Sequence, residues 1–217
     1  FSEADVAATY GQGSQAHLMV RAALTAWPYA TLSLITMSDD AAGVAATATI
    51  TFTGSATIQG VLRVGIANAD VLQIGVKRTD TAASVATAVA AAINAQVDLP
   101  VTAAAAAGVV TLTAKNKGTD GNFIRISHSL TAAGLTVVAT EFAGGDANPD
   151  IEPALTAIVA EGHDILAVGL NDAANLLKLR DHLEAVAAPQ EKRWALGVYG
   201  QTASLATATT QALALNS

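Results

Sequence analysis

Cysteine is absent from the 217-residue sequence, and charged and aromatic residues are scarce, at 13% and 4%. Without cysteine the chain can form neither disulfides nor thiolate metal sites. The formal net charge is −7 and no run of Lys or Arg occurs, so the electrostatic attraction that dominates nucleic-acid binding is missing. We therefore expect no direct contact with nucleic acid.

Long apolar runs are also missing. Thr, Gly, Asn or a charged residue interrupts each apolar stretch before it reaches the roughly 20 residues that a membrane-spanning helix needs. The first residues, Phe-Ser-Glu-Ala-Asp, lack the basic and apolar segments of a signal peptide. We expect no membrane insertion and no signal peptide in this chain, and because it lacks an initiator Met we expect it to be a fragment.

Small apolar residues and threonine dominate what is present. Hydrophobic residues make up 52% of the chain, so there is ample material for a core. With few aromatics, the core must be built from Ala, Val, Leu and Ile, and Thr supplies the β-propensity. So few charges leave a free monomer with much apolar surface, which predicts that part of this surface is buried against partners.

The alternation of helix and strand is interrupted once along the chain. It begins with a helix capped by Ser14 and a buried strand over residues 31–37. A long stretch of Thr, Val, Gly and Ala follows before helix and strand alternate again. We therefore predict that residues 1–40 and 147–217 form one discontinuous α/β domain, into which residues 41–146 are inserted as a second domain.

The insert is predicted to be rich in β-strands. Residues 46–53 alternate Ala, Ile and Phe with Thr, at the period of two that is typical of a half-buried strand, and a Gly54-Ser55 turn follows. Further strands are predicted at residues 57–66, 71–76, 101–105, 109–114, 124–128 and 135–142. One helix, capped by Asp80 or Thr81, ends at Asn94. We expect a sandwich or partly open barrel that contains one helix.

After the insert, strands over residues 164–170 and 194–199 alternate with helices. The helices are capped by Asp150 and by Asn171 or Asp172, and another follows the second strand. Strand–helix alternation predicts parallel strands with right-handed crossovers. The expected fold class of this domain is α/β, with a parallel or mixed sheet flanked by helices.

The sharpest enzymatic signal is GQGSQA at residues 11–16, which matches the dinucleotide-binding pattern GxGxxA. Asp39 or Asp40, past the next predicted strand, could bond a ribose hydroxyl. The fingerprint requires an apolar strand directly before the first glycine, but residues 1–10 are polar. We interpret the motif as a flexible turn before a capped helix and keep an NAD-binding Rossmann-like enzyme as an alternative.

No catalytic, cofactor-binding or metal-ligating residue is predicted. The histidines, His17, His128, His163 and His182, lie far apart without HExxH spacing, and there is no cysteine to complete a zinc site. No GxSxG elbow marks a nucleophilic serine. Residues 115–122 contain too few carboxylates for a calcium loop and are interpreted as a hairpin turn.

The order of several segments along the chain is informative. They read YGQGSQAHLMVRAAL, ATATITFTG, DTAASVATAVAAAINAQVDLPVTAAAAAGVVTLTAKNKGTDGN, AGGDANPDIEPAL, NDAANLLKLRDHLE and YGQTASLATATTQALALNS. In this order they resemble the contractile-tail sheath proteins of Mu-like phages and prophages. The resemblance covers nearly the whole chain, and a full family member would extend beyond both of its ends.

The resemblance implies a structural subunit of a virion, with no enzymatic activity and no cofactor. Such subunits polymerise as six-membered rings stacked around the tail tube and contract to drive the tube through the host envelope. The implied partners are copies of the chain itself, the tail tube protein, the baseplate and the tail terminator, with assembly in the host cytoplasm. The implied α/β domain has subtilisin-like topology without a working protease site.

A surface adhesin is a further alternative to the sheath interpretation. It would be built on the β-rich insert, because Thr-rich immunoglobulin-like domains often bind saccharides or receptors.

Overall fold

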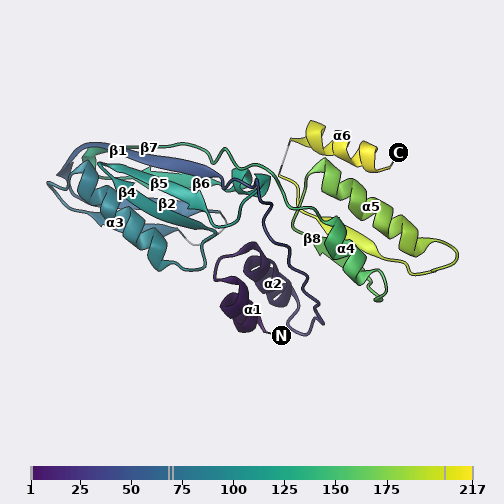
Figure 1. The fold of residues 1–217 in the computed structure, drawn as a ribbon. Helices are drawn as coiled ribbons and strands as arrows, with labels where there is room; N and C mark the ends of the chain where they lie inside the picture. Colours follow the sequence, from purple (N-terminus) through teal and green to yellow (C-terminus); the bar gives the residue numbers. More distant parts are fainter. Residues whose placement is uncertain (1, 68, 70, 203, 217) are drawn as a thin grey trace. The chain divides into compact units, whose positions relative to one another are not determined.

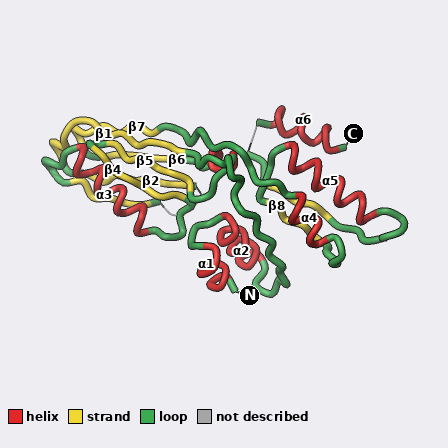
Figure 2. The backbone as a smooth tube through the Cα atoms, in the orientation of Figure 1, coloured by secondary structure: helices red, strands yellow, loops and turns green. Residues whose placement is uncertain are grey.

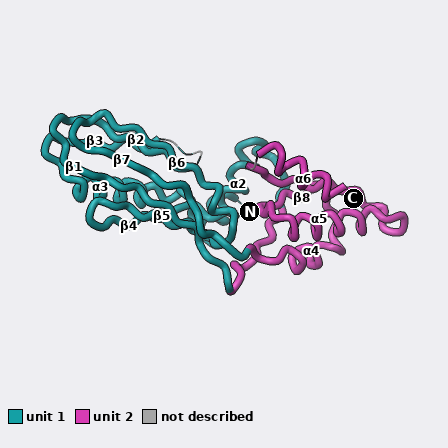
Figure 3. Tube along the Cα trace, turned by 90° about the horizontal axis from the view of Figure 1, so that it is seen from above, with its two compact units in different colours: residues 1–32, 42–147 teal, residues 33–41, 148–217 magenta. Residues whose placement is uncertain are grey.

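The structure is a computed structural model that describes residues 2–67, 69, 71–202 and 204–216. These residues form six α-helices and nine strands in three sheets, a mixed α/β fold (Figures 1 and 2). The chain divides into two compact units (Figure 3). Residues 1–32 and 42–147 make up the β-rich unit, and residues 33–41 and 148–217 make up the helical unit.

A four-stranded antiparallel sheet forms one side of the β-rich unit. Its strands, in spatial order, are β4 (Val101–Ala106), β5 (Val109–Ala114), β1 (Thr47–Ile58) and β7 (Ala133–Ala139). Along β1, Ala48, Ile50 and Phe52 are buried, while the threonines between them point outward. The period of two in this stretch therefore gives the predicted half-buried strand.

The strand β1 is longer than predicted, because Gly54 does not end it. The pairing of β1 with β7 shifts register between Gly54 and Ile58, and Gly54 has a φ of 87°. These features mark a β-bulge, which bends a strand without terminating it. The predicted Gly54-Ser55 turn is therefore wrong, and the predicted strand 57–66 is divided between β1 and β2 (Gly60–Ile66).

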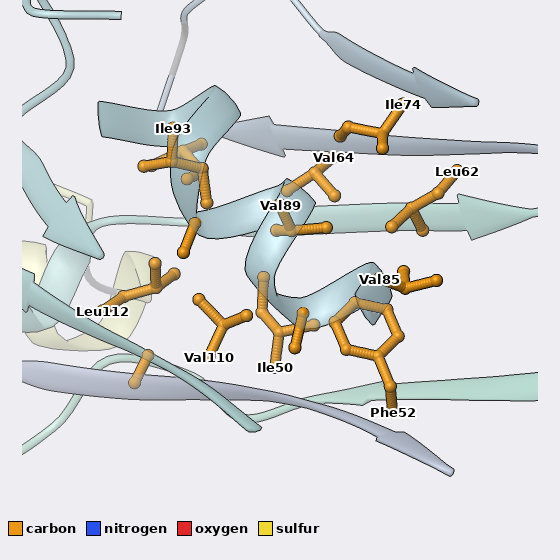
Figure 4. Packing of buried hydrophobic residues seen from close by; sticks show 14 of the residues in the cluster. Ile50, Phe52, Leu62, Val64, Ile74, Val85, Val89, Ile93, Val110 and Leu112 are labelled. Carbon is orange, nitrogen blue, oxygen red and sulfur yellow. The ribbon is translucent and has the colours of Figure 1, made fainter. Parts of the chain in front are cut away.

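A three-stranded antiparallel sheet lies on the other side, in the order β3 (Leu72–Val76), β2 and β6 (Ile126–Leu130). Helix α3 (Ala82–Ala95) packs its apolar face between the two sheets (Figure 4). Labelled core residues are Ile50, Phe52, Val110 and Leu112 from the first sheet, Leu62, Val64 and Ile74 from the second, and Val85, Val89 and Ile93 from the helix. The insert thus contains the one helix that the sequence predicts within it.

Helix α3 also protects a sheet edge. The Asn94 side-chain amide donates to the carbonyl of Ala103 at 2.8 Å and accepts from the amide of the same residue at 2.9 Å. An unpaired edge strand otherwise presents free backbone groups to other chains. The Asn94 side chain therefore satisfies the backbone N–H and C=O of Ala103, as a neighbouring strand would, at the edge strand β4.

The helical unit contains β8 (Ile165–Val168) and β9 (Leu196–Tyr199), which pair in parallel. Its helices are α4 (Glu152–Ile158), α5 (Ala173–Ala187) and α6 (Leu205–Leu215). Its core consists of Ile151, Leu155, Ile158, Leu170, Leu176 and Leu179, and Met37 packs against it. Strand–helix alternation thus gives a parallel pair, but the larger parallel sheet expected here is not confirmed.

A buried asparagine joins two helices of this unit. Asp172 caps α5 by accepting from the amide of Asn175 at 3.0 Å, as its position before the helix predicts. The Asn175 side chain accepts from the amide of Ile151 at 2.9 Å and donates to the carbonyl of Pro149 at 3.0 Å. These bonds fix the start of α4 against the start of α5.

Residues 31–37, predicted as a buried strand, have no regular secondary structure. Their apolar side chains are only half-buried or, like Ile35, exposed, and the pairings of the described strands do not include them. A strand forms only where a neighbouring strand accepts its backbone hydrogen bonds. The strand prediction is therefore wrong for this segment.

The N-terminal residues form two helices, α1 (Glu3–Tyr10) and α2 (Gln15–Ala26). Ser14 caps α2 by accepting from the amide of His17. Residues 1–32 have their contacts in the β-rich unit, although the sequence interpretation grouped them with residues 147–217. Within the described part of the chain, no helix has the length and apolar character to span a membrane.

Candidate interaction surfaces

The glycine motif at residues 11–16 spans the turn between α1 and α2 and the first two residues of α2. The segment before it is a helix, whereas dinucleotide binding requires a strand there. The amide of Gly13 donates to Nδ1 of His17 at 3.0 Å, and a Cβ atom at Gly13 would collide with the carbonyl oxygen of Leu99. This glycine permits close packing of the turn on the β-rich unit, and its N–H is already used.

Lys115 anchors that turn. Its ammonium group donates to the carbonyls of Gln12 and Val97, each at 2.7 Å, and burial lowers the pKa of the group. Next to it, the side chain of Asn116 accepts from the amide of Gln15 at 3.0 Å. The bonds to Gln12 and from Gln15 link the N-terminal segment to the residues after β5, and they explain why the N-terminal helices lie with the β-rich unit. The bond to Val97 holds the same ammonium group to the segment after α3.

Residues 115–122 are not a hairpin turn. They join β5 to β6, which belong to different sheets, and they contain the start of a 3₁₀ helix over Thr119–Phe123. The side chain of Asn122 accepts from the amide of Gly145 at 2.8 Å and donates to its carbonyl at 2.9 Å. The hairpin interpretation is therefore wrong. The segment connects the two sheets, and its side chains bond to the α1–α2 segment and to Gly145 near the end of the insert.

Two of the histidines come together in the helical unit. Nε2 of His163, which follows α4, lies 3.2 Å from Nε2 of His182 on α5. His17 is buried near Glu3, and His128 is exposed on β6. Within residues 2–67, 69, 71–202 and 204–216, no three His, Cys, Asp or Glu residues are grouped as metal ligands. Sequence spacing could not have found the pair, because only the packing of α4 on α5 brings it together.

The parallel pair β8–β9 has one apolar face exposed. Ile165 lies opposite Leu196, and Ala167 lies opposite Val198. Of these, Ile165 is 65% exposed and Leu196 is 60% exposed. The other face of the pair packs on the core of the helical unit. Parallel strands are normally covered on both sides, so this exposed apolar face is a candidate contact surface.

The outer face of the four-stranded sheet is a second candidate surface. Cross-strand pairs place Thr113 opposite Thr47, Thr111 opposite Thr49, and Thr136 opposite Thr53. The exposed positions of β4, β5, β1 and β7 carry uncharged side chains, mostly Thr, Ala and Val, so this threonine face has no charged side chain on its strands. Such a face can pack on another flat surface without burying an ion.

Comparison with curated proteins finds a relative of this chain, while no family model matches it. In an alignment of 190 residues that covers 85% of this chain, the sequence is 30% identical to the Mu-like prophage FluMu tail sheath protein of Haemophilus influenzae. The resemblance to the Mu-like tail sheath family is confirmed. The chain spans 37% of the length of that relative.

In this sheath-like chain, sequence reasoning missed the exposed apolar face of β8–β9 and the contact between His163 and His182. Alternating exposure along β8 and β9 was hidden because both segments read as fully apolar runs, which predict a strand covered on both faces. Trp194, next to β9, is 80% exposed, although a tryptophan in a short apolar segment favours burial. The apolar composition predicted buried partner surfaces, but only the structure locates the candidates.

Proposed function

We propose that this chain is part of a structural subunit of a phage or prophage tail sheath, a component of the virion. The observation that carries the proposal is the 30% identity to a tail sheath protein across 85% of the chain. The exposed apolar face of β8–β9 supports it, because a protein that works by polymerising needs apolar surface left over after folding.

The finer part of the proposal is mechanical. Subunits form six-membered rings stacked around the tail tube, end at a baseplate and a terminator, and contract to drive the tube through the host envelope. Contraction requires an extended lattice that is metastable relative to a contracted one, with interfaces exchanged between rigid subunits. The free energy then resides in subunit contacts, and we assign no residue to nucleotide hydrolysis or any other catalysis.

We also propose that residues 41–146 fold as an inserted domain and that the helical unit belongs to a larger α/β domain of subtilisin-like topology. The β-rich unit supports this division by having a core of its own around Ile50, Leu62 and Val89. The parallel pair β8–β9 has only two short strands and is exposed on one face, which supports a larger parallel sheet to which these two strands belong.

Electron microscopy tests the sheath assignment. The polypeptide is expressed from its full reading frame, and we expect tubular polymers of uniform diameter. The double substitution Ile165→Asp with Leu196→Asp places two charges on the exposed apolar face, and it should abolish the tubes while circular dichroism stays unchanged. Val138→Asp is the matched control, because Val138 is 64% exposed on the threonine face.

Two results would contradict this proposal. Failure of the unsubstituted protein to form tubes across salt and pH would remove the sheath function. Tubes formed equally well by the double variant would keep that function but remove the β8–β9 face from the contacts. Control tubes lost with Val138→Asp would instead point to the threonine face.

The two alternatives are tested separately. An NAD-binding enzyme is disfavoured by helix α1 in place of the required strand, and saturable NAD binding would restore it. An adhesin would use the threonine face, and specific glycan binding by the chain would favour it.

A further inference from the structure

The pair of His163 and His182 has the geometry of two ligands on one metal ion. Their Nε2 atoms are 3.2 Å apart and their ring centroids are 5.2 Å apart. The ring planes are 18° from parallel, and because the centroids are farther apart than the nitrogens, the two nearly parallel rings approach each other at their Nε2 atoms. Both Nε2 atoms are therefore directed towards the space between the rings.

The tautomer of His163 follows from its second hydrogen bond. Nδ1 of His163 lies 3.2 Å from the carbonyl oxygen of Glu161, which can only accept, so Nδ1 carries the proton. Nε2 of His163 then has a free lone pair and accepts from Nε2–H of His182. A metal-bound histidine typically donates its other ring N–H to a carbonyl or carboxylate in this way.

We propose that His163 and His182 together bind one divalent transition-metal ion through their Nε2 atoms, with Zn²⁺ as the best fit and water as the remaining ligands. A tetrahedral zinc with bonds of about 2.05 Å holds two imidazole nitrogens about 3.3 Å apart. The observed 3.2 Å needs only a small tilt of the rings. The proton on Nε2 of His182 moves to Nδ1 through solvent, so both ligands stay neutral and no proton is released.

The surroundings favour the neutral form of His182 but oppose a high affinity. Burial, the neighbouring His163 and the charge of Arg193 lower the pKa of His182, so its imidazole competes weakly for protons. The guanidinium of Arg193 donates to the carbonyls of Val159 and Glu161, and its charge is partly offset by Glu191 at 2.9 Å. With a cation so close and only two protein ligands, we expect binding in the micromolar range.

The selectivity should follow the preference of imidazole. Zn²⁺, Ni²⁺ and Cu²⁺ bind imidazole well, whereas Mg²⁺ and Ca²⁺ prefer oxygen ligands. This inference rests on the helical unit alone and does not depend on the sheath proposal.

Isothermal titration of the 217-residue chain with ZnCl₂ tests the inference. We expect one equivalent bound by the unsubstituted protein, and at least tenfold weaker binding after His163→Gln or His182→Gln. His128→Gln is the control and should bind as before, because His128 is exposed on β6. MgCl₂ should give no heat of binding.

Histidine ¹⁵N spectra give a second readout that does not depend on affinity. Zinc should shift the Nε2 resonances of both His163 and His182, and a chelator should reverse the shifts. A flat titration, or undiminished binding by the double glutamine variant, would overturn the inference and leave the pair as a hydrogen bond between α5 and the residues after α4. If His182→Gln unfolds, His163→Gln decides, because its ring is less buried.

Discussion

Replacing Ile93 by alanine should destabilise the β-rich unit and leave the helical unit unchanged. Ile93 is fully buried on α3, between the two sheets (Figure 4). Truncating a buried Ile to Ala costs about 2–5 kcal/mol, from lost apolar burial and the cavity left behind. The better helix propensity of alanine returns only about 0.4 kcal/mol. We therefore expect a loss of about 3 kcal/mol.

Hydrogen exchange measured by mass spectrometry locates the loss. A change of about 3 kcal/mol should speed exchange more than a hundredfold in the protected amides of β1, β5 and α3. Amides of α5 should keep their rates, because the helical unit has its own core around Leu176 and Leu179. Thr87→Ala, at an exposed position of the same helix, should change exchange less than threefold.

Two outcomes would refute this reasoning. Equal acceleration in α5 would mean that the two units unfold as one, and the proposed inserted domain would be lost. A loss below about 1 kcal/mol would mean that Ile93 does not sit in a packed core.

Three further predictions concern individual contacts. Lys115→Met should remove the hydrogen bond to Gln12 in the α1–α2 turn and the bond to Val97 after α3, so limited proteolysis should cleave residues 11–14 faster; unchanged cleavage would contradict this anchor. Gly13→Ala should lower the midpoint of thermal unfolding through its collision and its φ of 75°, whereas Gly200→Ala, in open space, should not. Burial raises the pKa of Asp172, but hydrogen bonds from Asn175 and Asn148 outweigh burial and leave the pKa below its ordinary value. The ionised carboxylate therefore stabilises the fold above its unfolded pKa of about 3.9. This stability is lost as the pH falls through the lower folded pKa. Asp172→Asn should flatten that acid dependence in a urea titration, and an unchanged slope would be evidence against it.

Local patterns determined much of the fold. The alternation of Thr with Ala, Ile and Phe predicted which side chains of β1 face the core, since a strand buries every second side chain on one face. Helix α3 begins at Thr81, one of the two proposed caps, through a reciprocal bond with Ser84. Helix α5 begins at Asp172, again one of two proposed caps. Each of these depends on side chains within a few residues of the backbone that they organise.

The errors occurred where the outcome depends on distant partners. The sequence at Gly54 predicts a turn, but β1 pairs with β7 on both sides of a bulge that begins at Gly54, so the strand continues. Residues 31–37 read as a strand, but no neighbouring strand is placed beside them among the described pairings. Strand formation needs hydrogen bonds from another segment, which the strand's own sequence does not encode.

The sequence by itself determined a protein without thiols, with few charges and with more apolar residues than one small core needs, which favours function through surfaces. Its segments, in their order, also indicated the sheath family. Only the tertiary structure decided that the N-terminal helices lie with the β-rich unit, that one face of β8–β9 is uncovered and that His163 meets His182. The physical reason is that composition and short-range periodicity are fixed locally, whereas exposure and pairing depend on which distant segments the folded chain brings together.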